Sequence, residues 1–503
     1  MTIDVAHPLG MMLALLPEVV LSLFAVLALL VTAWRHRTAV DSRMVGWVSL
    51  AGLLAAAAAL AWLWLGEARA FGITRMVVLD EFRYAAAGII LISAIATVLL
   101  SLTYLQRERM LAPEYYVLVL FGTVGMLFLA GADDMMVLFL GLEVMSIAVY
   151  VLAGYDRSSV YSAEAALKYF LIGAFASAFL LYGIALIYGV SGSTSLIGAS
   201  RALHAGVGLP VMGALGLGFL LIGFGFKVAA VPFHMWAPDV YEGAPTPVTG
   251  FMATGVKVAA FASLTRVLTT SFAAHPAAWQ APLTVLAILS MVVGNLVALS
   301  QRSLKRMLAY SSIAHAGYLL AALLPGTHLG AASTLVYLLA YALTSLAAFG
   351  LLSVLGSDGE RAVTLDSIAG LAGRRPWVAA GLSITMLSLL GFPGTFGFMG
   401  KWMILLGLTG AGHWVAAVVL VLASLVSAGY YLPVIMAVYM RPAAEGAPFD
   451  GIRIGAPAAV TIALAVALVV MLGLWPTPAM SPAQMGAASL FETASGWMLP
   501  LAR

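Results

Sequence analysis

The 503-residue chain is 63% hydrophobic and only 9% charged, and its mean hydropathy is +1.05. A soluble protein with this balance could not cover its core with polar groups, so the composition predicts a polytopic helical membrane protein. The sequence contains no cysteine, which excludes disulfides, thiolate-held iron–sulfur clusters and cysteine-ligated zinc. Any redox chemistry must therefore take place in other chains. The net charge of +3 is too small to indicate a nucleic-acid partner.

Apolar runs of about 20 residues predict about fourteen membrane-spanning helices. The first run follows an acidic segment and is long enough to span, so we expect no cleaved signal peptide. An even number of spans puts both termini on one side. No polar stretch is long enough for a second domain, so residues 1–503 are expected to form a single membrane domain. The expected spans are 11–33, 44–66, 80–104, 115–132, 134–154, 163–189, 209–235, 246–270, 280–300, 306–324, 329–355, 378–409, 414–440 and 456–475.

Loop charges orient these helices. The loops on one side carry fourteen arginines and lysines, and those on the other side carry five. By the positive-inside rule the richer side is cytoplasmic, which places both termini on the outer, periplasmic side of the cell inner membrane. The richer set is Arg35, Arg37, Arg43, Arg107, Arg109, Arg157, Arg302, Lys305, Arg306, Arg361, Arg374, Arg375, Arg441 and Arg453; the poorer set is Arg69, Arg75, Arg83, Arg201 and Arg503.

Two segments in the middle of the chain resemble each other. "KYFLIGAFASAF" from Lys168 aligns without a gap to "VYLLAYALTSLA" from Val336, and Tyr150 meets Tyr318 at the same spacing. Five spans, in 115–270, would then recur in 280–440. An odd number per repeat requires the second copy to be inverted in the membrane, as in many ion-translocating proteins. The alternative is that apolar helices resemble one another through composition alone.

Two expected spans carry helix breakers beside a lysine. Pro232 follows Lys227 by five residues, and "GFPGTFGFMGKW" places Pro393 and four glycines before Lys401. Proline removes a backbone hydrogen bond, which lipid tolerates only where protein or water satisfies the freed carbonyl. Proline and glycine are also common in transmembrane helices generally. We favour broken helices at a functional site because each break adjoins a charge.

Ionisable residues inside the spans are the candidate site. Each buried charge costs about 2.5–3.5 kcal/mol on insertion scales, so these residues need a role that leucine could not fill. A buried amine can take up and release a proton near neutral pH, and a nearby carboxylate changes how tightly the proton is held. Several lysines in series fit a proton relay better than a single covalent site. The central candidates are Glu143, Lys227, Lys257 and Lys401.

Four further ionisable residues are more ambiguous. Lys168 and Arg266 lie nearer to helix ends, where a long side chain can reach the interface; we favour this snorkelling for Arg266 and leave it open for Lys168. His234 and His315 are candidates either for the proton relay or for helix-to-helix hydrogen bonds. Asp239 and Glu242, in "FHMWAPDVYEGAPTP", are expected to be loop charges or subunit contacts.

Several motifs resemble a known family. "FLGLEVMSIAVYVLAGY", "EAALKYFLIGAFASA", "FKVAAVPFHMWAPDVYEGAPTPVTGFMA", "SLKRMLAYSSIAHAGYLL" and "GFPGTFGFMGKW" resemble the subunit N family of the bacterial NADH-quinone oxidoreductase, respiratory complex I. More distantly they are similar to the other antiporter-like subunits and to cation/proton antiporters. The likeness covers about residues 80 to 440. One departure is "FPGTFG", where the family pattern has two adjacent prolines.

The resemblance implies fold and roles. It implies an all-α membrane protein of fourteen helices, with two inverted five-helix repeats (helices 4–8 and 9–13) and with helices 7 and 12 broken. It assigns the central acid to Glu143 and the relay lysines to Lys227, Lys257 and Lys401. It matches His315 to a polar position of the central axis and Lys168 to a sixth-helix lysine.

The implied function is proton translocation by a subunit of a redox-driven pump. The chain itself would bind no cofactor, while NADH, FMN, iron–sulfur clusters and quinone would belong to partner subunits. Its partners would be other membrane subunits and, indirectly, the peripheral redox arm. The alternatives are a cation/proton antiporter without a redox partner and a structural membrane scaffold.

Overall fold

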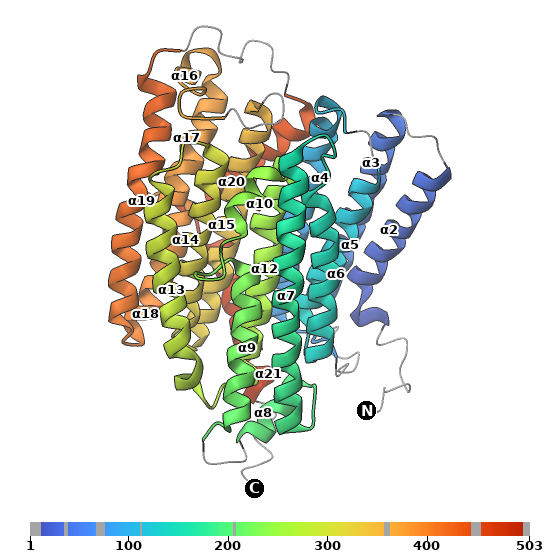
Figure 1. The fold of residues 1–503 in the computed structure, drawn as a ribbon, viewed down its shortest axis with the longest axis vertical. Helices are drawn as coiled ribbons and strands as arrows, with labels where there is room; N and C mark the ends of the chain where they lie inside the picture. Colours follow the sequence, from blue (N-terminus) through green and yellow to red (C-terminus); the bar gives the residue numbers. More distant parts are fainter. Residues whose placement is uncertain are drawn as a thin grey trace.

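The computed structural model describes residues 12–34, 39–66, 76–110, 113–204, 208–356, 363–443 and 454–495. Within these ranges the chain is a bundle of long helices that run close to parallel (Figure 1). The all-α membrane class is therefore confirmed. The long helices are α2 (Leu16–Trp34), α3 (Ala39–Leu65), α4 (Glu81–Arg107), α5 (Glu114–Gly131), α6 (Met135–Ala153), α7 (Val160–Ser191), α9 (Val211–Val228), α13 (Pro276–Ala298), α14 (Leu304–Leu323), α15 (His328–Leu355), α19 (Trp414–Met440), α20 (Ala456–Leu474) and α21 (Thr477–Ser495).

Shorter helices connect or interrupt the long ones. They are α8 (Leu196–His204), α10 (Ala237–Gly243), α11 (Thr246–Phe251), the π-helix η2 (Met252–Val256), α12 (Lys257–Thr270), α16 (Leu371–Arg374), α17 (Pro376–Leu390) and α18 (Phe396–Gly410). Figure 1 shows α8 at one end of the bundle and α16 at the other, and we use these two helices to name the ends.

Helices coincide with all fourteen expected spans. In the described part of the chain, twelve are long and apolar enough to cross a membrane by length and composition. Of the other two expected spans, 306–324 is α14, and 378–409 is divided into α17 and α18. The exact number of crossings stays a prediction. The helix α21 was not predicted, because its sequence is too polar to form an apolar run.

Side-chain caps fix where several helices begin. Asp134 accepts hydrogen bonds from the backbone N–H groups of Met136 and Val137 at the start of α6. Ser303 and Thr327 cap α14 and α15 in the same way. These side-chain oxygens satisfy N–H groups that have no partner inside the helix, and such groups are costly to leave unpaired in a membrane.

Burial divides the bundle into a centre and a lipid-facing rim. The combined helix of α11, η2 and α12 is completely buried across its apolar window, and α15 is 94% buried. The corresponding fraction for α2 is only 28%. In a membrane the outer helices can expose leucine and valine to lipid at no cost, so polar residues are expected to collect on the central helices.

At the α8 end, buried ion pairs tie helices together. Arg83 donates to Glu18 at 2.6 Å, linking α4 to α2. Arg266 on α12 donates to both carboxylate oxygens of Asp80, at 2.7 and 2.9 Å. The snorkelling expected for Arg266 is wrong. Its side chain is 2% exposed and forms this bidentate ion pair inside the protein.

The topology expectation is only partly testable within the described chain. Arg107, at the end of α4, donates to the carbonyl oxygen of Val354 near the end of α15, so these ends lie together at one end of the bundle. This arrangement agrees with the loop assignment. Both termini lie outside the described residues, as do the loop charges Arg35, Arg37, Arg69, Arg75, Arg361, Arg453 and Arg503.

Candidate functional site

The seventh expected span is broken at the lysine. A break was predicted within this span, 209–235, and α9 indeed ends at Val228, with Ala229 following in the left-handed region at φ +59°. Helix resumes in α10, and Figure 1 shows α9 and α10 in different halves of the bundle. The carbonyl of Phe226 accepts hydrogen bonds from the backbone N–H of Ala229 and from the ring N–H of Trp236, both at 3.0 Å. The break is therefore satisfied by protein, as a membrane interior requires.

Lys227, in the last turn of α9, is 2% exposed. Its ammonium nitrogen Nζ donates to the hydroxyl of Ser146 on α6 at 2.8 Å. The same nitrogen lies 5.4 Å from the ring centre of Tyr150 and 5.5 Å from that of Tyr169. Aromatic faces attract a cation without neutralising it. The surroundings of Lys227 therefore accommodate a charged amine but do not commit it to a carboxylate.

Glu143 lies on α6, three residues before Ser146, and so near the same helix face. Among the described residues its buried Oε1 has no hydrogen-bond partner. The direct contact of α6 with the amine is made by Ser146, and the coupling of Glu143 to Lys227 stays a prediction.

Lys257 follows a break that the sequence analysis did not predict. The five residues before it form η2, a π-helical turn, and such turns occur frequently at functional sites. Lys257 is 1% exposed and donates to the carbonyl and, at 2.6 Å, to the hydroxyl of Ser312 on α14. Its Nζ also lies 5.5 Å from the ring centre of Tyr341.

His315, 3% exposed, lies on α14 one turn beyond Ser311. Its Nδ1 is 2.8 Å from the hydroxyl of Tyr337, and its Nε2 is 3.2 Å from the hydroxyl of Tyr431. Both ring nitrogens therefore have hydroxyl partners from other helices. The prediction left a relay and a helix-to-helix hydrogen bond open for this residue, and the geometry is compatible with both.

The twelfth expected span is broken between α17 and α18. Gly391 follows α17 with φ +87°, a conformation that favours glycine. The last carbonyls of α17, on Leu389 and Leu390, accept hydrogen bonds from Lys401 Nζ at 3.1 and 2.9 Å. A cation is stabilised at a helix C-terminus by these free carbonyls. The same nitrogen lies 4.7 Å from the ring centre of Tyr318.

The two lysines at helix breaks have matching aromatic neighbours. The rings of Tyr150 and Tyr169 meet edge to face beside Lys227, with 4.7 Å between centres. The rings of Tyr318 and Tyr337 meet at a similar angle, with 6.3 Å between centres, and Lys401 lies over Tyr318. These are the tyrosines that the internal alignment pairs. The geometry supports the repeat, which itself stays a prediction.

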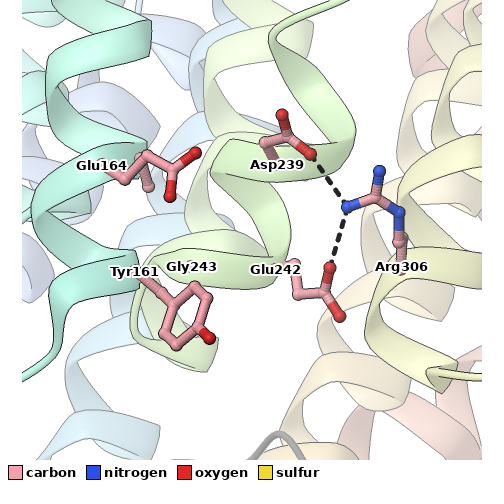
Figure 2. A pocket seen from close by; sticks show the side chains of 7 residues that line it. Tyr161, Glu164, Asp239, Glu242, Gly243 and Arg306 are labelled. Atoms are coloured by element: carbon pink, nitrogen blue, oxygen red, sulfur yellow. Dashed lines mark hydrogen bonds and ion pairs between the residues drawn. The ribbon is translucent and has the colours of Figure 1, made fainter.

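Lys168 lies apart from this buried row, beside a pocket of about 380 Å³ nearer the α16 end. Lys168 donates to Glu164 at 2.6 Å and to Asp239 at 2.7 Å. Arg306 donates to both Asp239 and Glu242 at 2.9 Å, as Figure 2 shows. Of the two roles expected for Asp239 and Glu242, that of loop charges is wrong, because both lie on α10 in an ion network that joins α7 to α14, and that of subunit contacts stays a prediction.

This network determines the ionisation of Asp239. Burial acts to raise the pKa of its carboxyl, but hydrogen bonds and attraction from Lys168 and Arg306 outweigh burial and hold the pKa below its usual range. His234, in the same break as Pro232, is half-buried, and its Nδ1 has no hydrogen-bond partner. The structure brings His234 close to the α9 break but gives it no contact that assigns a role.

The sequence analysis missed the neutral members of the site. Ser146, Ser312, Tyr337 and Tyr431 contact the relay candidates, yet hydroxyl residues are too common in membrane helices to stand out. The adjacent serines in "YSSIAHAGYL" were a usable signal, because they precede His315 by about one turn. In the described residues no group of three or more His, Asp or Glu side chains could hold a metal ion.

Comparison with known proteins agrees with this geometry. Residues 132–427 match the family model described as "NADH:quinone oxidoreductase/Mrp antiporter, TM". The chain belongs to this family. It is 43% identical over 474 residues to the NADH-quinone oxidoreductase subunit N of Trichlorobacter lovleyi, covering 93% of this chain and 96% of that protein.

Solved structures show the same family fold. A chain of respiratory complex I from Thermus thermophilus is 38% identical, with a TM-score of 0.78 over 92% of this chain and 98% of that chain. A chain of the Mrp complex from Dietzia sp. DQ12-45-1b has a TM-score of 0.84 over 98% of this chain and 99% of that chain, at 22% identity. At that identity the second likeness carries the fold alone.

Proposed function

We propose that this chain moves protons through the membrane along a buried relay of Glu143, Lys227, Lys257 and Lys401. The chain is a multi-pass membrane subunit of NADH-quinone oxidoreductase, a proton-translocating complex, as its relatives at 38–47% identity indicate. Its partners are other membrane subunits of that complex. NADH oxidation and quinone reduction belong to the complex as a whole, with the redox cofactors in partner subunits.

One observation is the main support for the proposed relay. Lys227, Lys257 and Lys401 are each at most 6% exposed and each lies at a helix irregularity, yet their hydrogen bonds go only to neutral oxygens. A buried ammonium without a bonded carboxylate is costly to keep charged, so losing its proton is within reach. An arginine in such a place would stay protonated, whereas a lysine can release its proton.

Glu143 would regulate whether Lys227 holds or releases its proton. Its charge favours the protonated state of Lys227, so a movement that separates the two would release a proton, and one that joins them would take a proton up. Glu143 and Ser146 both lie on α6, and Ser146 bonds to Lys227 on α9, so a small rotation of α6 would move both groups relative to the amine. Lys168, His234 and His315 belong to the proposal as accessory members.

The organisation of the chain is also part of this proposal. Residues 115–270 and 280–440 are proposed as the two inverted repeats, supported by the matching tyrosine pairs beside Lys227 and Lys401. We further propose that the α16 end faces the cytoplasm and that both termini lie outside, on the basis of the loop charges.

A cation/proton antiporter without a redox partner is the second reading. It has the same fold, but the relatives at 38–47% identity are named as subunits of NADH-quinone oxidoreductase. Purification of the native complex from membranes, followed by mass spectrometry, tests the choice. Co-purified flavin and iron–sulfur subunits are expected, and a complex of membrane chains alone would overturn it.

The relay is tested by proton uptake into vesicles per NADH oxidised. In an assembled complex, Lys257→Leu is expected to reduce this uptake by about 100-fold along this path, the contribution typical of a positioned proton-transfer group. Undiminished uptake in complexes with Lys227, Lys257 or Lys401 replaced would favour a structural scaffold.

A further inference from the structure

Tyr431 on α19 connects two side chains of α14. Its hydroxyl is hydrogen-bonded to the hydroxyl of Ser311 and lies 3.2 Å from Nε2 of His315. Ser311 and His315 are four residues apart and therefore neighbours on one face of the helix. The side chain of Tyr431 is completely buried. A phenol in this position can accept a proton from one partner while donating its own to the other.

The chain of contacts continues beyond His315. Nδ1 of His315 is 2.8 Å from the hydroxyl of Tyr337, and that ring packs edge to face against Tyr318. Lys401 lies over the ring of Tyr318. This end of the row of contacts therefore reaches the side chains that surround Lys401.

The opposite end reaches the preceding lysine. Ser311 is next in sequence to Ser312, whose hydroxyl accepts a hydrogen bond from Lys257 at 2.6 Å. A row of exchangeable protons, Ser311 to Tyr431 to His315 to Tyr337, thus begins beside Ser312 in the sequence and ends at the tyrosine that packs against Tyr318.

We propose that Tyr431 is a proton-relay residue that joins the Lys257 side to His315. This inference rests on the proposed relay of lysines and adds a member from α19, a helix that contributes none of those lysines.

Each group in the row is neutral before and after one proton has passed. In one orientation Ser311 donates to Tyr431, Tyr431 donates to Nε2, and the Nδ1–H donates to Tyr337. A proton that arrives on the Ser311 oxygen shifts each proton by one bond, so Tyr337 releases one proton toward Lys401. Every donor then points back toward Lys257, and the imidazole has changed tautomer. Rotation of the hydroxyls and return of the tautomer reset the row.

Tyr431→Phe tests the proposal, because it keeps the buried ring and removes only the hydroxyl. The matched control is Tyr115→Phe, which removes another buried hydroxyl bonded to a serine, Ser101 at 2.9 Å, on helices that carry none of the relay lysines. Both variants are measured in the assembled complex in vesicles, with the amount of assembled complex determined independently. We expect Tyr431→Phe to lower NADH-driven proton uptake by about tenfold or more and Tyr115→Phe to leave it within about twofold.

A conservative variant distinguishes proton transfer from packing. Site-specific 3-fluorotyrosine at position 431 keeps the hydroxyl and nearly the same shape but makes the phenol more acidic. We expect it to restore uptake relative to Tyr431→Phe and to shift the pH profile of uptake, whereas a purely structural tyrosine would leave that profile unchanged. An unshifted profile together with normal uptake in Tyr431→Phe would overturn the inference.

Lys257→Leu, measured alongside, separates this inference from the proposed function. If Lys257→Leu stops uptake while Tyr431→Phe pumps normally, the lysine relay stands and Tyr431 is not part of it. If Lys257→Leu itself pumps normally, the lysine relay fails.

Discussion

Lys227 donates its 2.8 Å hydrogen bond to the hydroxyl of Ser146 and not to the carboxylate of Glu143. The acid is therefore free to act on the amine through space while an uncharged group holds the amine in place. This division of tasks suits a switch better than a direct ion pair, which would hold the proton tightly.

The first prediction concerns this pair. Glu143→Gln removes the coupled charge, and Lys227→Ala removes the carrier, so each should reduce proton uptake per NADH oxidised by about 100-fold along this path. Lys227→Arg should be comparably damaging because guanidinium keeps its proton at physiological pH. Since both residues act in one step, the double variant should cost no more than the worse single one.

Assembly is the control for these variants, because a half-removed buried pair can destabilise the fold. Normal pumping by an assembled Lys227→Ala complex would show that the lysine is structural and that the proton path does not pass through it.

The second prediction concerns the helix break before Lys401. Gly391 has φ +87°, and a Cβ there would approach Lys401 Cδ to 2.9 Å. Gly391→Ala should therefore destabilise the protein by about 1–2 kcal/mol through backbone strain alone and should displace the lysine from the α17 carbonyls. The melting temperature and the proton uptake are both expected to fall.

Gly88→Ala is the matched control, since its added Cβ meets no atom within 4 Å and it lies inside a regular helix, α4. It should be neutral or slightly stabilising. Equal effects of the two glycine substitutions would contradict a special conformation at Gly391.

The third prediction concerns pH. Burial raises the pKa of the Asp133 carboxyl, in the turn between α5 and α6, to about 7; Arg266 opposes the shift, and Asp80 and Asp134 add to it. Between about pH 4 and 7 the folded protein binds a proton that the unfolded chain has released, so the contribution of Asp133 to stability falls as pH rises through that window. Asp133→Asn should therefore raise the melting temperature at pH 8 and have little effect near pH 4.

The control for this pH effect is Asp366→Asn, at a side chain that is 92% exposed and paired with Arg441 at 3.1 Å. Thermal unfolding of the purified complex from pH 4 to 8 makes the measurement. A gain for Asp133→Asn that is the same at every pH would show that proton binding is not its cause.

The fourth prediction is the topology. Reporter fusions in the loops beside Arg107 and Arg374 should both be cytoplasmic, and a fusion at the C-terminus should be outside, because the side with fourteen arginines and lysines is retained in the cytoplasm. Opposite locations for the two loops would require a different set of spans.

The fifth prediction is that the isolated polypeptide does not oxidise NADH. It has no cysteine and no glycine-rich dinucleotide fingerprint after a strand, so it lacks the means to hold redox cofactors by itself. Purified alone in detergent, it should show no NADH-dependent quinone reduction. Robust activity of the single chain would contradict the assignment of redox chemistry to partner subunits.

The sequence by itself determined the class of protein, the approximate helices and the charged members of the site. Hydrophobicity sets the length of a membrane helix directly, and a lysine inside an apolar run is conspicuous because lipid makes it costly. For these reasons Glu143, Lys227, Lys257 and Lys401 could be chosen without a structure. The breaks at Pro232 and Pro393 were predictable for a similar reason, since proline cannot continue the hydrogen bonding of a helix.

Only the tertiary structure decided which groups each charge meets. Arg266 was expected at an interface, but it is bonded to Asp80, which caps the start of α4 and is distant in sequence. The π-helical turn before Lys257 contains no proline and was not predicted from the sequence. Tyr431 comes from α19, and its place between Ser311 and His315 depends on how helices far apart in the chain pack, which no periodicity or motif within one helix records.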